Sequence, residues 1–312
     1  KPAVLTKQTI RDINQKKDSL LFIQMDSLKI GDVYATGIPA IVLKSNLILE
    51  CLKLDGFLGS NVLQNSVIQF DTQNQKIRIA NDTSNLNLKG IEAENLTLDS
   101  QGSPFLKFKI GKKISEYAMF DSGSDVFYSM AHGKVQKMKR AKDFEVIHTA
   151  TGSNQVGLYG VAGNEETYLL RIPFAQLNGV RVHSIISETS TNSYSRLGSS
   201  ILKYGLLTID YKMKTFYFKP YAENTTYQSD EFQINPTFSG NKFLIGKIWE
   251  KELEKIVNLG DEIIAIDDIN LSNISVCDML TGILRQENTQ RKLDVKRKDG
   301  STVSVTISKI KY

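Results

Sequence analysis

The chain has 312 residues, of which 41% are hydrophobic and 23% are charged, and its formal net charge is +5. This composition is ordinary for a globular protein and excludes a mainly disordered chain. No apolar run reaches the roughly 18 residues that a membrane-spanning helix needs, so no transmembrane segment is predicted. The densest basic run, residues 134–142, has no interleaved aromatic residue, so a solvated surface is expected there and no nucleic-acid partner is predicted.

Residues suited to metal binding or nucleophilic catalysis are few and scattered. The three histidines show no ligand spacing, which disfavours a zinc enzyme and a Ser-His-Asp or Cys-His enzyme. Cys51 and Cys277 form no metal motif. Because they fall in segments expected to belong to different domains, two separate thiols are predicted rather than a disulfide. The cysteines and histidines therefore give no support for a metal site.

The first predicted elements are two strands within residues 19–43, separated by a turn at Gly31. Phe57-Leu58-Gly59 follows, and its glycine lets the backbone pass close to a neighbour. A short helix, a strand at residues 67–71, a turn and a strand at residues 76–79 complete this part.

This order of elements occurs twice in the chain. Residues 196–218 align without a gap with residues 57–79, 139 positions earlier, and residues 167–187 correspond to residues 19–43 with a turn at Gly179. The identical positions in the first copy are Leu58, Gly59, Ser60, Leu63 and Asp71. Internal duplication of this length predicts two similar lobes, residues 1–95 and residues 96–220.

The second lobe contains the sharpest chemical feature. An apolar strand at residues 116–120 leads directly into Asp121-Ser122-Gly123-Ser124. The two serine hydroxyls can hydrogen-bond an ionised carboxylate, and Gly123 permits a tight turn. Such a tripeptide alone is usually an ordinary β-turn. Its place between apolar strands, with Leu197-Gly198 downstream in the same lobe, favours a presented catalytic acid.

The pattern of Asp121-Ser122-Gly123 with a later Leu197-Gly198 resembles the aspartic peptidases of the pepsin and retroviral-protease type. The first-lobe segment Asp55-Gly56-Phe57-Leu58-Gly59 is similar to retropepsin-like bacterial proteins. The resemblance covers roughly residues 1–220 and implies a mostly β, two-lobed β-barrel fold. Arg196, directly before Leu197, departs from the hydrophobic residue of the family pattern.

The resemblance also implies an activity, that of an aspartic-type endopeptidase without metal or cofactor. Two aspartates share one proton and activate a water that attacks a peptide carbonyl in a peptide or unfolded protein. Asp121 would be one of them, Ser122 would brace the two loops, and Ser124 would hydrogen-bond the carboxylate. The family also implies a flap at residues 146–159, with its tip at Thr151, Gly152 and Ser153. An ordinary surface hairpin is an equal alternative.

The first lobe lacks its own Asp-Thr/Ser-Gly. The repeat places that loop about 18 residues before Lys1. None of the aspartates at positions 12 to 55 precedes Thr/Ser-Gly, so they are interpreted as surface or turn carboxylates: Asp12, Asp18, Asp26, Asp32 and Asp55.

Three explanations stay open for the missing loop. The first strands are outside this sequence, they lie on a separate chain, or they do not exist and the protein is an inactive peptide-binding relative. A dimer of single lobes is disfavoured, because this chain already has two Leu-Gly elements. The first lobe is expected to expose strand edges and to be strand-swapped or completed by a partner.

The last third of the chain has a different pattern. A polar linker is predicted at residues 221–230, followed by a domain at residues 231–312. Leu259-Gly260-Asp261 leading into a strand, a helix at residues 275–285 and a final hairpin at residues 293–307 resemble a protease-associated PDZ domain. The resemblance implies that a peptide adds as a strand beside residues 243–248. The usual carboxylate-binding loop is not evident, so a purely structural role stays open. Kinship with bacterial proteins implies a cell-envelope or secreted location.

Overall fold

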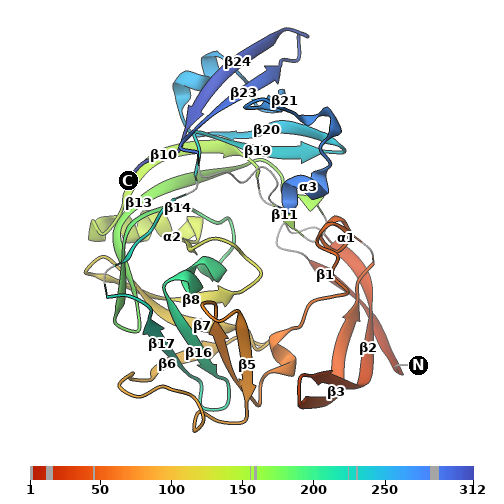
Figure 1. Ribbon diagram of the computed structural model, residues 1–312, viewed down its shortest axis with the longest axis vertical. Helices are drawn as coiled ribbons and strands as arrows, with labels where there is room; N and C mark the ends of the chain where they lie inside the picture. Colours follow the sequence, from red (N-terminus) through yellow and green to blue (C-terminus); the bar gives the residue numbers. More distant parts are fainter. Residues whose placement is uncertain are drawn as a thin grey trace.

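The computed structural model describes residues 3–11, 17–44, 46–154, 156–157, 160–223, 225–229, 231–281 and 288–312. These residues are mostly β-strands arranged in several sheets (Figure 1), as predicted, and the arrangement is compatible with two β lobes. The helices are short: α1 (Leu47–Leu52), α2 (His132–Met138), α3 (Val276–Leu280), and the 3-10 helices η1 (Ser60–Val62), η2 (Lys139–Ala141), η3 (Ser199–Lys203), η4 (Lys251–Lys255) and η5 (Leu271–Asn273). None of these helices is long and apolar enough to cross a membrane.

The two copies of the sequence repeat meet in one sheet. Its order is β5-β4-β16-β17, formed by β4 (Val67–Asp71), β5 (Lys76–Ala80), β16 (Gly205–Asp210) and β17 (Thr215–Pro220). Gln69 pairs with Thr208, its own equivalent 139 residues on, and donates a hydrogen bond to it at 2.9 Å. The two copies are therefore related by a local two-fold axis at this pair.

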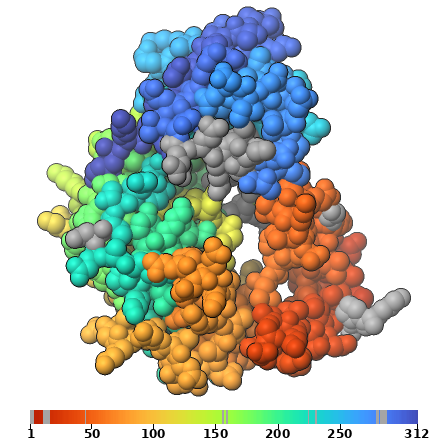
Figure 2. All heavy atoms as spheres, in the orientation of Figure 1, coloured from red at the N-terminus to blue at the C-terminus, as the bar shows by residue number. Residues whose placement is uncertain are grey.

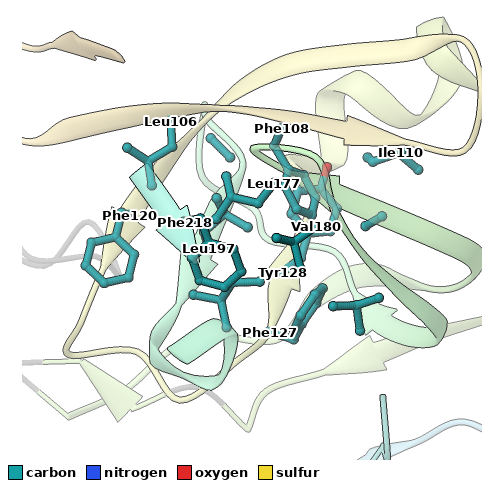
Figure 3. Close-up of a cluster of buried hydrophobic side chains, with 14 of the residues drawn as sticks. Leu106, Phe108, Ile110, Phe120, Phe127, Tyr128, Leu177, Val180, Leu197 and Phe218 are labelled. Carbon is teal, nitrogen blue, oxygen red and sulfur yellow. The ribbon is translucent and has the colours of Figure 1, made fainter. Parts of the chain in front are cut away.

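The second copy builds a complete lobe around a large apolar core. Its strands are β6 (Glu94–Leu98), β7 (Pro104–Ile110), β8 (Ile114–Asp121), β9 (Tyr128–Ser129), β10 (Glu145–Gly152), β13 (Glu165–Leu177), β14 (Val180–Glu188) and β15 (Arg196–Gly198). Alternate residues of β7 and β8 are buried, as a strand with one face on a core requires. Leu106, Phe108 and Leu197 meet in this core (Figure 3).

The first copy is less complete than the second. A separate antiparallel sheet, β1-β2-β3, is formed by β1 (Ala3–Arg11), β2 (Lys17–Ile30) and β3 (Val33–Val42), and it corresponds in order to β10-β13-β14. Among the described residues of the first copy, β7, β8, β9 and α2 have no counterpart. Leu58 is accordingly 48% exposed, whereas its equivalent Leu197 is fully buried. Figure 2 shows a hollow between the N-terminal residues, coloured red to orange, and the green and yellow atoms of the second lobe.

The C-terminal residues form a sheet of their own over a separate cluster of buried apolar residues. The strands are β19 (Ile234–Ser239), β20 (Lys242–Ile248), β21 (Glu262–Ile266), β22 (Ile269–Asn270), β23 (Gln290–Lys296) and β24 (Thr302–Ser308). The predicted helix is described only as α3, because residues 282–287 lie outside the described residues. Part of the predicted linker is structured, since β18 (Thr225–Thr226) pairs in parallel with β14.

The prediction of two separate thiols is wrong. Cys51 of α1 and Cys277 of α3 form a disulfide between the N-terminal segment and the C-terminal sheet. α1 and α3 lie side by side in Figure 1, although 226 positions separate the two cysteines. Sequence spacing could not reveal this contact, because it depends on how the C-terminal sheet sits over the rest of the chain.

Candidate functional site

Asp121 is the last residue of β8, at the edge of the buried core. Gly198 of β15 pairs with Asp121 in parallel register, and Leu197 pairs with both Phe120 and Tyr128. The Leu-Gly element therefore lies between the two strands that enter and leave the loop of residues 121–127, here called the Asp121 loop. A Cβ atom on Gly198 would lie 2.2 Å from the carbonyl oxygen of Val126, so only glycine fits there.

The Asp121 loop is fixed by hydrogen bonds at both ends. Oδ1 of Asp121 accepts from the amide of Gly123 at 3.0 Å. On the far side, the amide and the hydroxyl of Ser199 donate to the carbonyl of Ser124 at 2.7 and 2.8 Å. Ser124 thus contributes its backbone to the loop, while Ser122 is exposed at the turn. The roles predicted for the two serine hydroxyls stay predictions.

Arg196 faces the candidate catalytic carboxylate. Its Nε lies 3.4 Å from Oδ2 of Asp121, and the side chains of Arg196 and Asp121 are 12% and 32% exposed. Arg196 is held in β15 between Met119 and Ser129, so its position is set by a central strand. The sequence showed only that Arg196 departs from the family pattern. Its contact with Asp121 follows from the parallel register of β15 and β8.

A buried polar cluster lies under the loop, and sequence reasoning missed it. The hydroxyl of Tyr128 donates to Oε1 of Glu116, while Lys134 Nζ and Ser195 Oγ lie 2.6 and 2.9 Å from Oε2. Burial, and next the negative charge of Glu116, raises the pKa of Tyr128 well above its ordinary value. Tyr128 therefore stays a neutral donor, and the cluster ties β8, β9 and α2 together.

Lys134→Met is expected to lower the free energy of unfolding by about 2 kcal/mol, because it leaves the buried carboxylate of Glu116 without its cation. The value is below that of a fully buried pair, since Lys134 is partly exposed. Urea unfolding followed by circular dichroism measures the change. Lys137→Met, on the exposed face of α2, is the matched control, and an equal loss in both variants would contradict this role for Lys134.

The predicted flap tip is wrong in its position. β10 runs straight through Thr151 and Gly152, and the antiparallel pair β11 (Val156–Gly157) and β12 (Gly160–Val161) lies further along the chain. The amide of Ser153 donates to the carbonyl of Gly246 in β20 at 2.9 Å. These residues therefore pack on the C-terminal sheet, because a Cβ-free Gly152 allows the two backbones to touch. Tyr159, at the end of the predicted flap, lies outside the described residues.

The first-copy aspartates considered as a substitute for the second acid are half-buried or exposed wherever the structure describes them. Asp18 pairs with Lys44 at 3.0 Å, and Asp26, Asp32 and Asp55 are exposed, consistent with surface or turn carboxylates. Asp12 lies outside the described residues. Within the described part of the chain, no three His, Cys, Asp or Glu side chains gather in a way that could hold a metal ion.

Two cavities lie away from the Asp121 loop. One of about 450 Å³ is lined by residues 146–149 of β10 and residues 249–252. The other, of about 510 Å³, lies on the sheet shared by the two repeat copies and is lined mostly by polar side chains such as Asn74 and Arg78. Asp121 lines neither of these two cavities.

Comparison with known proteins adds little to this geometry. No protein-family model and no curated protein matches the chain. Among solved structures, basic 7S globulin from soybean is similar with a TM-score of 0.33 at 10% identity, over 68% of this chain and 71% of that one. Conglutin gamma, a basic 7S globulin from lupine seeds, gives 0.34 at 10% identity, over 68% and 72%. These values are too low to support a conclusion on function, which therefore has to come from the chain's own residues.

Proposed function

We propose that the chain contributes Asp121 as one of two catalytic carboxylates of an aspartic-type endopeptidase. The observation that carries the proposal is the pairing of Gly198 with Asp121, which fixes a carboxylate at the end of a buried strand. A loop held on both sides keeps this acid in one place, as general acid–base catalysis requires. The loop and the Leu-Gly element are the two parts in which the sequence resembles aspartic peptidases.

The surroundings of Asp121 suit the role of general base. Arg196 Nε lies 3.4 Å from the carboxylate of Asp121, whereas the equivalent position in the first copy is the apolar Phe57. Asp121 would take a proton from the attacking water, and the second carboxylate, beside Phe57, would donate one to the substrate carbonyl. Two acids in different environments divide the acid and base roles in this way.

The second carboxylate would come from a polypeptide unit that covers the open first copy. The second copy shows what such a unit would look like. There, Leu197 is covered by β8, the Asp121 loop and β9. The equivalent residues Phe57 and Leu58 are exposed and apolar. This unit would therefore be a strand–loop–strand segment with Asp-Thr/Ser-Gly in its loop.

A second candidate function is peptide binding without cleavage. It is favoured by one observation, the ion pair of Arg196 with Asp121, which gives Asp121 a structural partner in place of a second acid. In this case the C-terminal sheet and the second lobe would hold a peptide but not hydrolyse it.

The C-terminal sheet would help to hold substrate or partner in the manner of a PDZ domain. β20 has β19 along one edge, and β21 and Ser153 contact it elsewhere, so a peptide strand added to β20 would have to replace one of them.

Disulfides persist in oxidising compartments, and the Cys51–Cys277 bond therefore supports a cell-envelope or secreted location.

In a protein that includes the unit with the second carboxylate, Asp121→Asn is expected to reduce cleavage of an unfolded protein substrate by about 10²–10⁴-fold, because an amide cannot act as the base. Asp26→Asn, at an exposed carboxylate, is the control and should cleave like the unsubstituted protein. Thermal melting of both variants tests that folding is intact. Cleavage that persists in Asp121→Asn removes Asp121 from the mechanism, and peptide binding without any cleavage favours the second candidate.

A further inference from the structure

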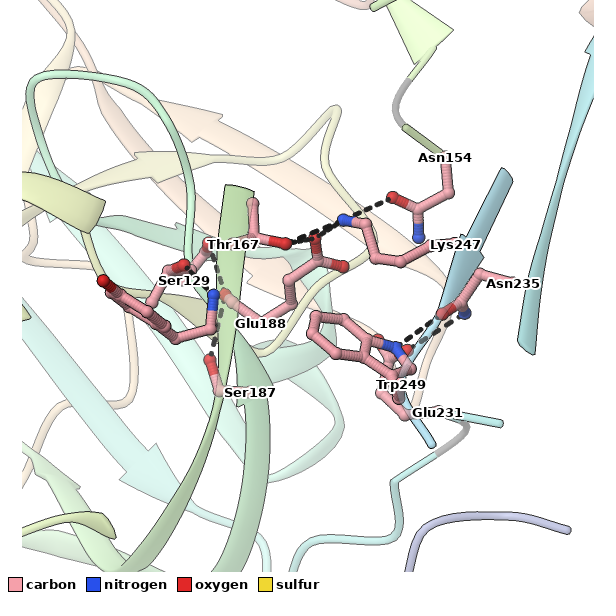
Figure 4. A network of polar contacts seen from close by, with 11 residues as sticks. Ser129, Asn154, Thr167, Ser187, Glu188, Glu231, Asn235, Lys247 and Trp249 are labelled. Carbon is pink, nitrogen blue, oxygen red and sulfur yellow. Dashed lines mark hydrogen bonds and ion pairs between the residues drawn. The ribbon is translucent and has the colours of Figure 1, made fainter. Parts of the chain in front are cut away.

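Lys247 of β20 reaches from the C-terminal sheet into the second lobe. Its side chain is 2% exposed, and Nζ contacts the carboxylate of Glu188 in β14 (Figure 4). Nζ also lies 2.9 Å from Oγ1 of Thr167 in β13 and 3.4 Å from Oδ1 of Asn154. A buried ammonium is stable only when it is paired and hydrogen-bonded, so these contacts depend on the two parts staying together.

The two backbones touch beside this ammonium. A register shift between β19 and β20 leaves Gly246 without an opposite residue, and its carbonyl accepts from Ser153 instead. A Cβ atom on Gly152 would lie 2.1 Å from the oxygen of Gly246. The backbone of the C-terminal sheet is therefore in direct contact with residues 152–153 of the second lobe. We expect added charge or volume at this contact to weaken the packing of the sheet on the lobe.

Glu231 adds a second acid to this interface. Its Oε2 accepts from Nδ2 of Asn235 at 3.1 Å, and Oδ1 of Asn235 accepts from Nε1 of Trp249 at 2.7 Å. Burial, and next the negative charge of Glu188, raises the pKa of Glu231 to about 7. Asp125 also raises this pKa, and Lys247 together with the Asn235 hydrogen bond lowers it. Glu231 is therefore near enough to Glu188 and Lys247 for both charges to act on its carboxyl group.

The same contacts lead to the Asp121 loop. The hydroxyl of Ser129, in the strand that leaves the loop, donates to the carbonyl of Glu188 at 2.8 Å. The hydroxyl of Ser187 donates to the carbonyl of Tyr128. The end of β14 is thus bonded to β9, the strand that directly follows the Asp121 loop, and through its Glu188 carboxylate to the C-terminal sheet.

We propose that Lys247, Glu188 and Glu231 form a pH-sensitive latch that couples docking of the C-terminal sheet to the Asp121 loop. With Glu231 protonated, Lys247 neutralises Glu188 and the latch is closed. A raised pKa means that this stabilisation is complete below the ordinary value of 4.5 and is lost as pH rises through about 7. The latch then opens, because the ionised side chain of the half-buried Glu231 competes with Glu188 for the ammonium of Lys247. Its effect on cleavage rests on the proposed function, but the latch itself does not.

The only tryptophan of the chain, Trp249, reports on the latch through Asn235. Its fluorescence is expected to change with a midpoint near pH 7, the value to which the pKa of Glu231 is raised, and to lose this change in Glu231→Gln. Hydrogen exchange gives a second reading at the amide of Ser153, which bonds to Gly246. Its protection factor should fall about tenfold between about pH 6 and pH 8 in the unsubstituted protein and stay constant in Glu231→Gln.

His148→Gln is the necessary control. His148 lines the cavity beside Trp249, and histidines as a class change charge between about pH 5 and pH 8. The latch predicts that the transition persists in His148→Gln. A transition that survives in Glu231→Gln and disappears in His148→Gln overturns the proposal, as does a Ser153 protection factor with the same pH dependence in the unsubstituted protein and in Glu231→Gln. Neither reading uses cleavage, so an inactive protein would refute the proposed function and leave the latch testable.

Discussion

Removal of the Cys51–Cys277 disulfide is expected to lower the free energy of unfolding by about 3–5 kcal/mol. The bond closes a loop of 226 residues and so restricts the unfolded chain strongly. Urea unfolding of the protein with and without a reducing agent measures the difference. Cys51→Ser combined with Cys277→Ser should match the reduced protein and should not respond to the reducing agent.

Removal of the disulfide should destabilise the sheet β1-β2-β3 more than the second lobe. The sheet β1-β2-β3 is attached to the rest of the chain by this disulfide and by contacts such as the hydrogen bond from Asn61 to the carbonyl of Pro39, at 3.1 Å. Hydrogen exchange in β2 should therefore increase more than in β13, its counterpart in the complete lobe. Equal stability of the reduced and oxidised proteins would show that the bond does not constrain the fold.

Lys247→Met is expected to lower the free energy of unfolding by about 3–5 kcal/mol, because it leaves the carboxylate of Glu188 unpaired in the interface. Lys242→Met, in the same strand, removes an exposed ion pair with Glu262 and should cost below about 1 kcal/mol. Urea unfolding followed by Trp249 fluorescence and by circular dichroism measures both variants.

A double substitution separates charge from packing. Lys247→Met with Glu188→Gln removes both charges, so the loss should be smaller than the sum of the two single losses. Additive losses, or a Lys247→Met variant as stable as Lys242→Met, would show that the ion pair does not stabilise the interface.

Several elements could be predicted from residues alone, because they depend on local geometry. The turns at Gly31 and Gly179 lie where the strands of both copies reverse, and both glycines have a positive φ. The final hairpin, β23 and β24, turns at Gly300 as expected. The repeat predicted that Leu197-Gly198 and Asp121 belong to one unit, and their parallel pairing agrees with it.

Contacts between distant segments could not be predicted in the same way. The ion pair of Arg196 with Asp121 requires the register of β15 on β8, and the Glu116 cluster requires α2 to cover that pair. The flap tip was placed by resemblance to a family, and that resemblance could not show that Gly152 and Ser153 contact Gly246 of the C-terminal sheet.

By itself, the sequence determined the mostly β composition, the internal repeat and the place of Asp121 at the end of an apolar strand, since each is a property of neighbouring residues. Tertiary structure alone decided the Cys51–Cys277 bond, the Lys247 contacts and the exposure of Leu58. The physical reason is the same in all three. Residues far apart in the chain come into contact only when the sheets pack against one another. A local sequence pattern does not predict which surfaces will be in contact.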